Sequence, residues 1–206
     1  MVYLLNTSLA EMLERADRWL FVRINTDMAN SFFDNLMPFM RNPPNWAPLY
    51  LFLIVFALLN FRGKGLWWTM FLLVTVALCD MTGNYVFKRN FERLRPCNDP
   101  EFFMQVRLIA DHCSTGYSFV SNHAANHFGI ATFFYLTARK LIGRWALIGF
   151  VWAGVISVAQ VYIGIHYPFD ILAGAAIGAI FGAVTGSIFN NRFGIVIFDS
   201  QPTLSS

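Results

Sequence analysis

The chain has 206 residues, of which 56% are hydrophobic, 17% aromatic and 13% charged, and its formal net charge is +3. A disordered chain is poor in aromatic residues, and an average soluble domain carries about 25% charged residues, so both classes are excluded. The sequence has no long run of Lys or Arg, and we expect no nucleic-acid partner. The composition indicates an integral membrane protein whose surroundings are membrane lipids.

Residues 1–41 are predicted to form a unit of interfacial helices. Ser8 and Glu11 fit a capping box at the start of the first helix. The apolar residues that follow recur at helical spacing: Leu9, Met12, Leu13, Ala16 and Leu20. Charged residues lie between them, as in an amphipathic helix that lies in the membrane interface. A second short helix is expected over residues 31–40. The apolar start at residues 2–5 is too short for the core of a signal peptide.

Long windows without Asp, Glu, Lys or Arg predict the membrane-spanning segments. A helix needs about 20 mostly apolar residues to cross the hydrocarbon core. We expect about five transmembrane helices, near residues 44–61, 65–87, 117–138, 145–164 and 168–189. The predicted fold is therefore an all-α membrane helix bundle. Residues 42–191 form its main domain, and residues 192–206 form a C-terminal tail.

Lys and Arg in short loops predict the orientation of the bundle, because such loops face the cytoplasm. The loops at 61–65 and 139–144 carry five of these cations. If the spans alternate, the long segment 88–113 and the turn 165–168 lie on the opposite, outer side. Cys97 and Cys113 flank that long segment. A disulfide between them is permitted outside the cytoplasm, and two free thiols are the alternative.

Polar residues that are costly at membrane depth gather on this outer side. Lys88 and Arg95 follow the second span, His123 opens the third, and His166 and Asp170 lie between the fourth and fifth. This set suits cleavage of a phosphate ester through a phosphohistidine. The cations hold the phosphate oxygens, and one imidazole, oriented by the carboxylate, attacks phosphorus. The second imidazole protonates the leaving oxygen. This chemistry needs no metal or other cofactor.

These residues resemble three motifs of the type 2 phosphatidic acid phosphatases, which are lipid phosphate phosphatases related to vanadium haloperoxidases. The first motif, K-x-x-x-x-x-x-R-P, is complete at 88–96. The second, P-S-G-H, is Val-Ser-Asn-His at 120–123. The third, S-R-x-x-x-x-x-H-x-x-x-D, spans 159–170, with its leading Ser and Arg replaced by Ala and Gln. The three motifs keep the family's order and spacing across roughly residues 45–190.

The resemblance implies a role for each matching residue. His166 is the expected nucleophile, Asp170 orients it, and His123 is the general acid. The remaining motif residues are expected to bind the phosphate: Lys88, Arg95, Ser121, the backbone of Asn122, and Gln160. The implied function is hydrolysis of a lipid phosphate monoester or diphosphate at the periplasmic or outer face of a bacterial inner membrane. Undecaprenyl diphosphate, phosphatidylglycerol phosphate and the phosphates of lipid A all fit the resemblance as substrates.

Gln160 is the most consequential departure from the family pattern, because Gln donates a hydrogen bond but carries no charge. Either Arg89, Arg93 or Arg107 supplies the missing cation, or turnover is slow. A catalytically weak or inactive lipid-phosphate binding protein on the same fold is therefore an alternative function. A membrane oxidase with histidine-bound iron is another, although four His residues are few for such a site.

Three further patterns each leave two interpretations open. Asp80, Asn84 and Lys88 share one helix face, which is either a polar path from the active site or a helix-packing contact. His123 and His127 are spaced like a metal pair, but His127 also fits a packing role. Four small residues at i, i+4 spacing in the last span form either a dimer face or a packing face inside the bundle. They are Gly174, Gly178, Gly182 and Gly186.

Overall fold

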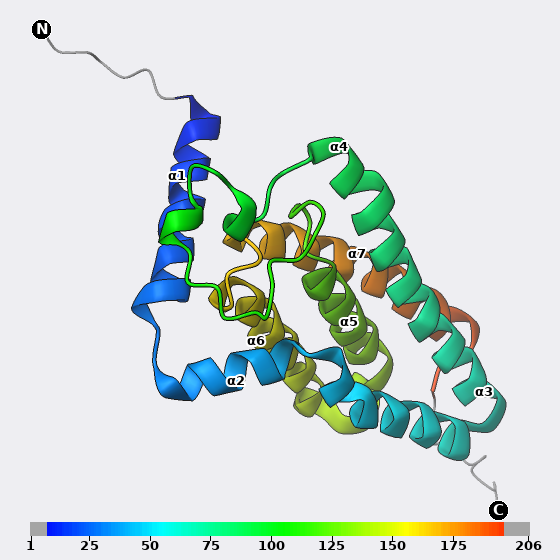
Figure 1. Cartoon of the computed structure of the whole chain (residues 1–206). Helices are drawn as coiled ribbons and strands as arrows, with labels where there is room; N and C mark the ends of the chain where they lie inside the picture. Colours follow the sequence, from blue (N-terminus) through cyan, green and yellow to red (C-terminus); the bar gives the residue numbers. More distant parts are fainter. Residues whose placement is uncertain (1–7, 196–206) are drawn as a thin grey trace, which may run out of the picture.

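The structure is a computed structural model that describes residues 8–195 (Figure 1). The predicted apolar start and most of the predicted tail lie outside this range. The α-helices follow in chain order: α1 Leu9–Val22, α2 Ser31–Arg41, α3 Ala47–Met81, α4 Arg89–Phe91, α5 Asn122–Ile142, α6 Ile148–Tyr162 and α7 Pro168–Arg192. A π-helical segment continues α3 through Thr82–Lys88. The all-α fold is confirmed.

Three continuous helical stretches in the described part of the chain are long and apolar enough to cross a membrane: Pro43–Asn98, Asn122–Tyr162 and Pro168–Arg192. The first is broken at Arg62, whose φ of 50° and ψ of −123° are not helical. The second is interrupted at Gly143, where φ is 59°. Both breaks fall in the predicted cationic loops, and Figure 1 shows them away from α4. The membrane bundle is confirmed, and the exact number of transmembrane helices stays a prediction.

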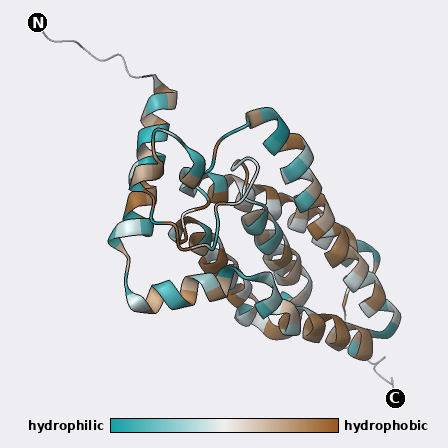
Figure 2. Cartoon of the chain, in the orientation of Figure 1, coloured by the Kyte–Doolittle hydropathy of each residue, from teal (hydrophilic) through white to brown (hydrophobic). Residues whose placement is uncertain are grey.

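Hydrophobic and hydrophilic residues lie in different parts of the bundle. Figure 2 shows hydrophobic residues along much of α3 and the helices behind it, and hydrophilic residues at α4. The loop between α4 and α5 lies near the start of α7, at the side of the bundle that carries the predicted site (Figure 1).

Glycines on one face of α7 allow this helix to pack directly on the backbone of α5. An ideal Cβ at Gly178 would lie 2.1 Å from the carbonyl oxygen of Ala125, and one at Gly182 would lie 2.4 Å from that of Gly129. Real Cβ atoms do not approach an oxygen so closely. The glycine ladder is therefore a packing face inside the bundle, as one of the two interpretations predicted, and it fixes α7 against α5 behind the site.

Gly178→Ala is expected to lower the stability of the folded bundle by about 1–3 kcal/mol, because the new methyl group forces the two helix backbones apart. Gly154→Ala in α6 is the matched control, since no atom lies within 4 Å of its ideal Cβ position. Thermal unfolding in detergent measures both variants. An unchanged unfolding temperature for Gly178→Ala contradicts the close contact.

The N-terminal helices pack on the bundle through polar side chains and through two buried apolar ones, Phe21 of α1 and Met37 of α2. The predicted capping box of α1 is confirmed, with the Glu11 N–H donating to Ser8 Oγ at 3.3 Å. Asp17 and Phe21 are the buried residues of α1. Asp34 of α2 accepts hydrogen bonds from Arg107 and Tyr162, which hold the pKa of its carboxyl below the usual value. The apolar stripe of α1 is therefore not what attaches it: its first members, Leu9, Met12 and Leu13, stay exposed.

Candidate active site

The turn between α6 and α7 presents His166. The backbone N–H groups of Ile165 and His166 both donate to the carbonyl of Gln160, at 3.2 and 3.3 Å, which closes the turn after α6. Pro168 begins α7, as its fixed φ favours, and the acid at Asp170 lies in the first turn as predicted. This local chemistry places a buried imidazole just before a helix N-terminus, four residues from its predicted carboxylate partner.

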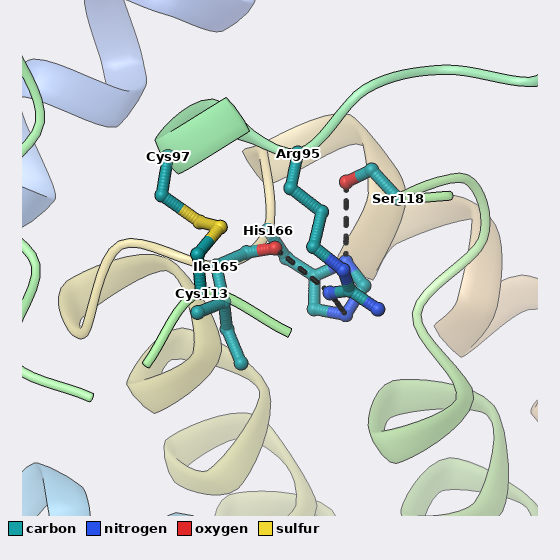
Figure 3. The surroundings of a disulfide bond; sticks show 6 residues. All are labelled: Arg95, Cys97, Cys113, Ser118, Ile165 and His166. Carbon is teal, nitrogen blue, oxygen red and sulfur yellow. Dashed lines mark hydrogen bonds between the residues drawn. A yellow bond between two sulfur atoms is a disulfide. The ribbon is translucent and has the colours of Figure 1, made fainter. Parts of the chain in front are cut away.

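The hydrogen bonds of His166 define its tautomer. Nη1 of Arg95 lies 3.1 Å from His166 Nε2 (Figure 3). A guanidinium has no acceptor, so Nε2 carries the lone pair and Nδ1 the hydrogen. Nδ1 faces Asp170 Oδ2 and Ser118 Oγ, each at 3.4 Å. Burial lowers the pKa of His166 to about 4, so the imidazole is neutral at pH 7 and Nε2 is available as a nucleophile.

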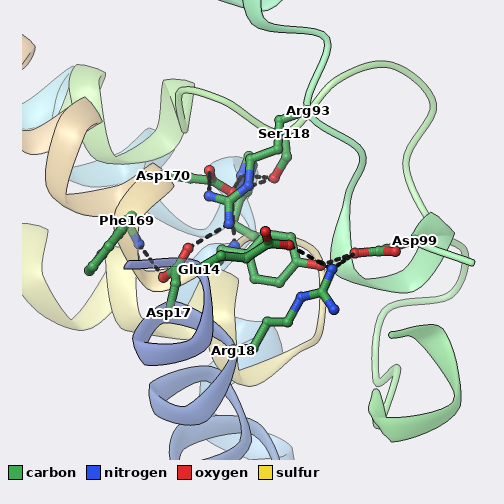
Figure 4. Close-up of polar contacts among 10 residues, drawn as sticks. Glu14, Asp17, Arg18, Arg93, Asp99, Ser118, Phe169 and Asp170 are labelled. Carbon is green, nitrogen blue, oxygen red and sulfur yellow. Dashed lines mark hydrogen bonds and ion pairs between the residues drawn. The ribbon is translucent and has the colours of Figure 1, made fainter. Parts of the chain in front are cut away.

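Asp170 is a fully buried hub of hydrogen bonds (Figure 4). It accepts from the Tyr167 N–H and from Arg93 Nη1, both at 2.8 Å, and from the hydroxyl of Ser118. Arg93 also donates to Asp17 Oδ2 at 2.6 Å, so a guanidinium bridges two buried carboxylates. The carboxylate behind His166 is thereby fixed from α1 and from two loops. Ser118 and Asp17 were not predicted from the sequence, because neither belongs to a motif.

A disulfide holds the loop that carries Arg95. Cys97 and Cys113 are joined, with a Cα–Cα distance of 5.9 Å, so the first of the two alternatives, a disulfide, is the one that forms. Figure 3 shows this disulfide beside Arg95 and His166. Arg95 also donates to the Ile165 carbonyl at 3.0 Å. Nη1 of Arg95 is thus held by the Ile165 carbonyl and by the lone pair of His166 Nε2.

Lys88 lies at the end of a polar network that joins α3 to α5. Its ammonium donates to Asn84 Oδ1 at 3.2 Å, and Asn84 donates to Asp80 at 2.9 Å. Asn122 donates to both Asp80 and Asn84, at 2.7 and 2.9 Å. An ideal Cβ at Gly83 would lie 2.3 Å from Asn122 Oδ1, so Gly83 makes room for the Asn that replaces the motif's Gly. Both interpretations of this face hold, because it packs two helices and also orients Lys88.

The start of α5 contributes the second histidine. Ser121 is buried and caps this helix, with its Oγ accepting from the Ala124 N–H at 3.5 Å. His123 is half-buried and lines a cavity of about 410 Å³. The charge of Lys88 acts on both His123 and His166. The structure therefore brings Arg95 into direct contact with His166, and the charge of Lys88 acts on both predicted catalytic imidazoles.

His127 is a packing residue and not half of a metal pair. Its Nε2 lies 3.0 Å from the Tyr50 hydroxyl, and its Nδ1 lies 2.7 Å from the His123 carbonyl oxygen. Its ring also packs edge-on against Trp152, with 4.8 Å between the centroids. Because both ring nitrogens are hydrogen-bonded, neither is free to bind a metal.

Gln160 is fully buried, and neither atom of its side-chain amide has a hydrogen-bond partner within residues 8–195. The Arg residues predicted to replace the missing charge are engaged elsewhere. Arg93 pairs with two carboxylates, and Arg107 pairs with Asp34 at 2.7 Å. Arg89 is exposed, with its guanidinium 4.7 Å from the Tyr85 ring centroid. None of these three arginines takes the place of a cation at position 160.

Fold and site together define a membrane phosphatase: a helical bundle with a carboxylate-oriented histidine beside an arginine and near a lysine. A family model described as the PAP2 superfamily matches residues 68–193. The chain belongs to the PAP2 superfamily.

Known relatives and solved structures agree with this assignment. The chain is 33% identical over 175 residues to a lipid A 4'-phosphatase of Bacteroides thetaiotaomicron, covering 84% of this chain and 76% of that protein. It is 28% identical over 134 residues to an undecaprenyl-diphosphatase of Sulfolobus acidocaldarius, covering 65% and 58%. The fold is similar to a PAP2-type phosphatidylglycerolphosphate phosphatase of Bacillus subtilis, with a TM-score of 0.66 and 17% identity over 91% of this chain and 90% of that one. The chain is an integral membrane lipid phosphatase.

Proposed function

We propose that the chain hydrolyses a lipid phosphate monoester or diphosphate through a phosphohistidine on His166. The observation that carries this proposal is the hydrogen-bonding of that imidazole. A donor-only guanidinium faces Nε2, and a buried carboxylate lies behind Nδ1. This arrangement fixes a neutral imidazole with its lone pair directed toward the cation that would hold the phosphate.

The reaction has two steps. In the first, Nε2 of His166 attacks phosphorus, the P–O bond to the lipid breaks, and His123 gives its proton to the leaving oxygen. Asp170 stabilises the positive charge that develops on the His166 ring. In the second, water attacks the phosphohistidine, His123 takes a proton from that water, and inorganic phosphate leaves. Lys88 and Arg95 hold the phosphate oxygens, whose charge is spread in the transition state. The N-terminal amides of α5, beginning at Asn122, add hydrogen-bond donors.

We propose that the substrate is a phosphorylated glycolipid of the lipid A type. The relative with 33% identity is named for this activity, and its match covers most of both chains. The cavity beside His123 supports a lipid substrate. It is polar near Asp80 and Asn122 and becomes apolar toward its remaining walls, which include Ile54, Leu72, Leu73, Val76 and Ile130. A phosphate at Lys88 therefore leaves an apolar surface for the neighbouring part of the lipid.

The site is proposed to lie on the periplasmic face of a bacterial inner membrane. The disulfide at Cys97 and Cys113 supports this orientation, because disulfides persist in oxidising compartments. The cationic turns at Arg62 and Arg144 support it too, since they lie on the other side of the bundle, as cytoplasmic loops do.

Phosphate release from a panel of lipids tests the proposal. Purified protein in detergent is given lipid A, undecaprenyl diphosphate and phosphatidylglycerol phosphate, with EDTA present throughout. We expect release from lipid A to be the fastest and to be insensitive to EDTA. Faster release from undecaprenyl diphosphate contradicts the substrate assignment alone. No release from any lipid by folded protein contradicts the enzymatic function and favours a binding protein.

A further inference from the structure

Three cations have no carboxylate partner in the described part of the chain, and two of them, Lys88 and Arg95, belong to the predicted phosphate site. Lys88, Arg95 and Arg41 form no salt bridge with a described residue, whereas Arg93 and Arg107 do. The side chain of Arg41 also makes no hydrogen bond to any residue between 8 and 195, unlike Lys88 and Arg95. Arg41 is thus a half-buried cation without a counter-ion in contact, and the mechanism so far does not use it.

Arg41 ends α2 and lines a cavity next to the one that contains His123. It lines a cavity of about 350 Å³ together with Asp111, Ser114 and Ile163. Pro43 lines this cavity and also the one that contains His123. Arg41 therefore lies two residues before Pro43, which borders the cavity that contains His123.

The charge of Arg41 reaches the catalytic groups. It acts on Arg95, which contacts His166, and it acts on His123. Lys88 repels Arg95 as well. Burial lowers the pKa of Arg41, and Asp111 opposes this effect from beyond contact distance. Partly burying like charges near one another is unfavourable, and a multivalent anion among them relieves the repulsion.

A phosphate ester is such an anion, with a charge near −2 and three oxygens that accept charge-assisted hydrogen bonds. Position 160 supplies no charge to it, because Gln160 is neutral and buried. Arg89, Arg93 and Arg107 are engaged elsewhere. Among the arginines to which the resemblance gives no role, Arg41 has a guanidinium with no partner among residues 8–195. Its charge also acts on two residues of the site, Arg95 and His123.

We propose that Arg41 is the third cation of the phosphate site and takes the place of the motif arginine that Gln160 replaces. The inference rests on the proposed phosphatase function. It makes the N-terminal helix α2 part of the active site, so that the guanidinium approaches the phosphate from outside the bundle. The ligand it recognises is a phosphoryl group on a lipid or the inorganic phosphate that leaves.

The activity of variants tests whether Arg41 replaces the arginine that is missing at position 160. Arg41→Gln is expected to lower kcat/KM about 10²-fold, as loss of one charge-stabilising donor does. Adding Gln160→Arg to the Arg41→Gln variant is expected to raise kcat/KM again by at least about tenfold. Arg89→Gln removes the same charge from an exposed site and should change the rate less than about threefold. An Arg41→Gln rate equal to that of the unmodified protein overturns the proposal, and so does a double variant with no gain.

Binding of orthovanadate, a phosphate analogue, separates this inference from the proposed function. Its dissociation constant is measured from the shift in thermal unfolding, which requires no turnover. We expect Arg41→Gln to weaken binding about tenfold, Arg41→Lys to weaken it less, and Arg89→Gln to leave it unchanged. Equal affinity in Arg41→Gln and the unmodified protein overturns the role of Arg41, whether or not any lipid is hydrolysed. If no lipid is hydrolysed but Arg41→Gln binds vanadate more weakly, only the proposed function fails.

Discussion

His166→Ala is expected to lower kcat by at least about 10³-fold for every lipid that the unmodified protein hydrolyses. The substitution removes the atom that forms the bond to phosphorus, and no other imidazole is in contact with Asp170. Phosphate release with EDTA present measures the effect. Because His166 is 3% exposed, a thermal unfolding scan accompanies the assay to show that the variant is folded.

Comparing His123→Ala with His166→Ala distinguishes the general acid from the nucleophile. A soluble aryl phosphate has a leaving group that departs without a proton, so cleavage of its P–O bond needs no general acid. We expect His123→Ala to lose lipid hydrolysis but to release a burst of about one equivalent of aryl alcohol, and His166→Ala to show no burst. Equal losses with both substrates in both variants contradict the assignment of nucleophile and acid.

Asp170→Asn is expected to lower kcat by about 10²- to 10⁴-fold, because the orienting carboxylate behind the imidazole is lost. It is also expected to destabilise the fold by about 3 kcal/mol, since one partner of a buried ion pair loses its charge. The carboxylate accepts hydrogen bonds from Arg93, Tyr167 and Ser118, and an amide cannot accept all of them. Phosphate release per folded molecule and thermal unfolding measure the two effects separately.

Asp17→Asn is the matched control for this prediction. Asp17 is also fully buried and also pairs with Arg93, but it does not contact His166. We expect a comparable loss of stability, because Arg93 and the Phe169 N–H both donate to Asp17. We expect the rate per folded molecule to fall less than about tenfold. A large loss of rate with Asp17→Asn would mean that Asp170 acts mainly through the position of Arg93.

Local patterns in the sequence predicted much of this structure. The capping box at Ser8, the start of α7 at Pro168 and the acid in its first turn are set by neighbouring residues, so a sequence window contains their physical cause. The helical membrane fold follows from composition in the same way. The motifs also predicted that Arg95 and Asp170 lie beside His166, and both contact its ring in the structure.

Contacts between distant segments account for what the sequence did not predict. Asp17 and Arg93 are 76 positions apart, and Asp17 and Phe169 are 152 apart. Ser118 reaches Asp170 from a loop with no regular periodicity. The burial of Asp17 contradicts the usual behaviour of a charged residue on an amphipathic helix, and only its partners in the fold explain it. The salt bridges of Arg93 and Arg107 also join distant segments, so only the folded structure shows that these two arginines are paired.

Trapping the phosphorylated protein tests the central claim most directly. The His123→Ala variant is mixed with an aryl phosphate labelled in the phosphoryl group, quenched in alkali after the burst, and digested for peptide mapping. We expect an acid-labile, alkali-stable phosphoryl group on the peptide that contains His166, and none when His166 is replaced by Ala. A label on another residue, or a burst with no label retained on the protein, would contradict a phosphohistidine on His166.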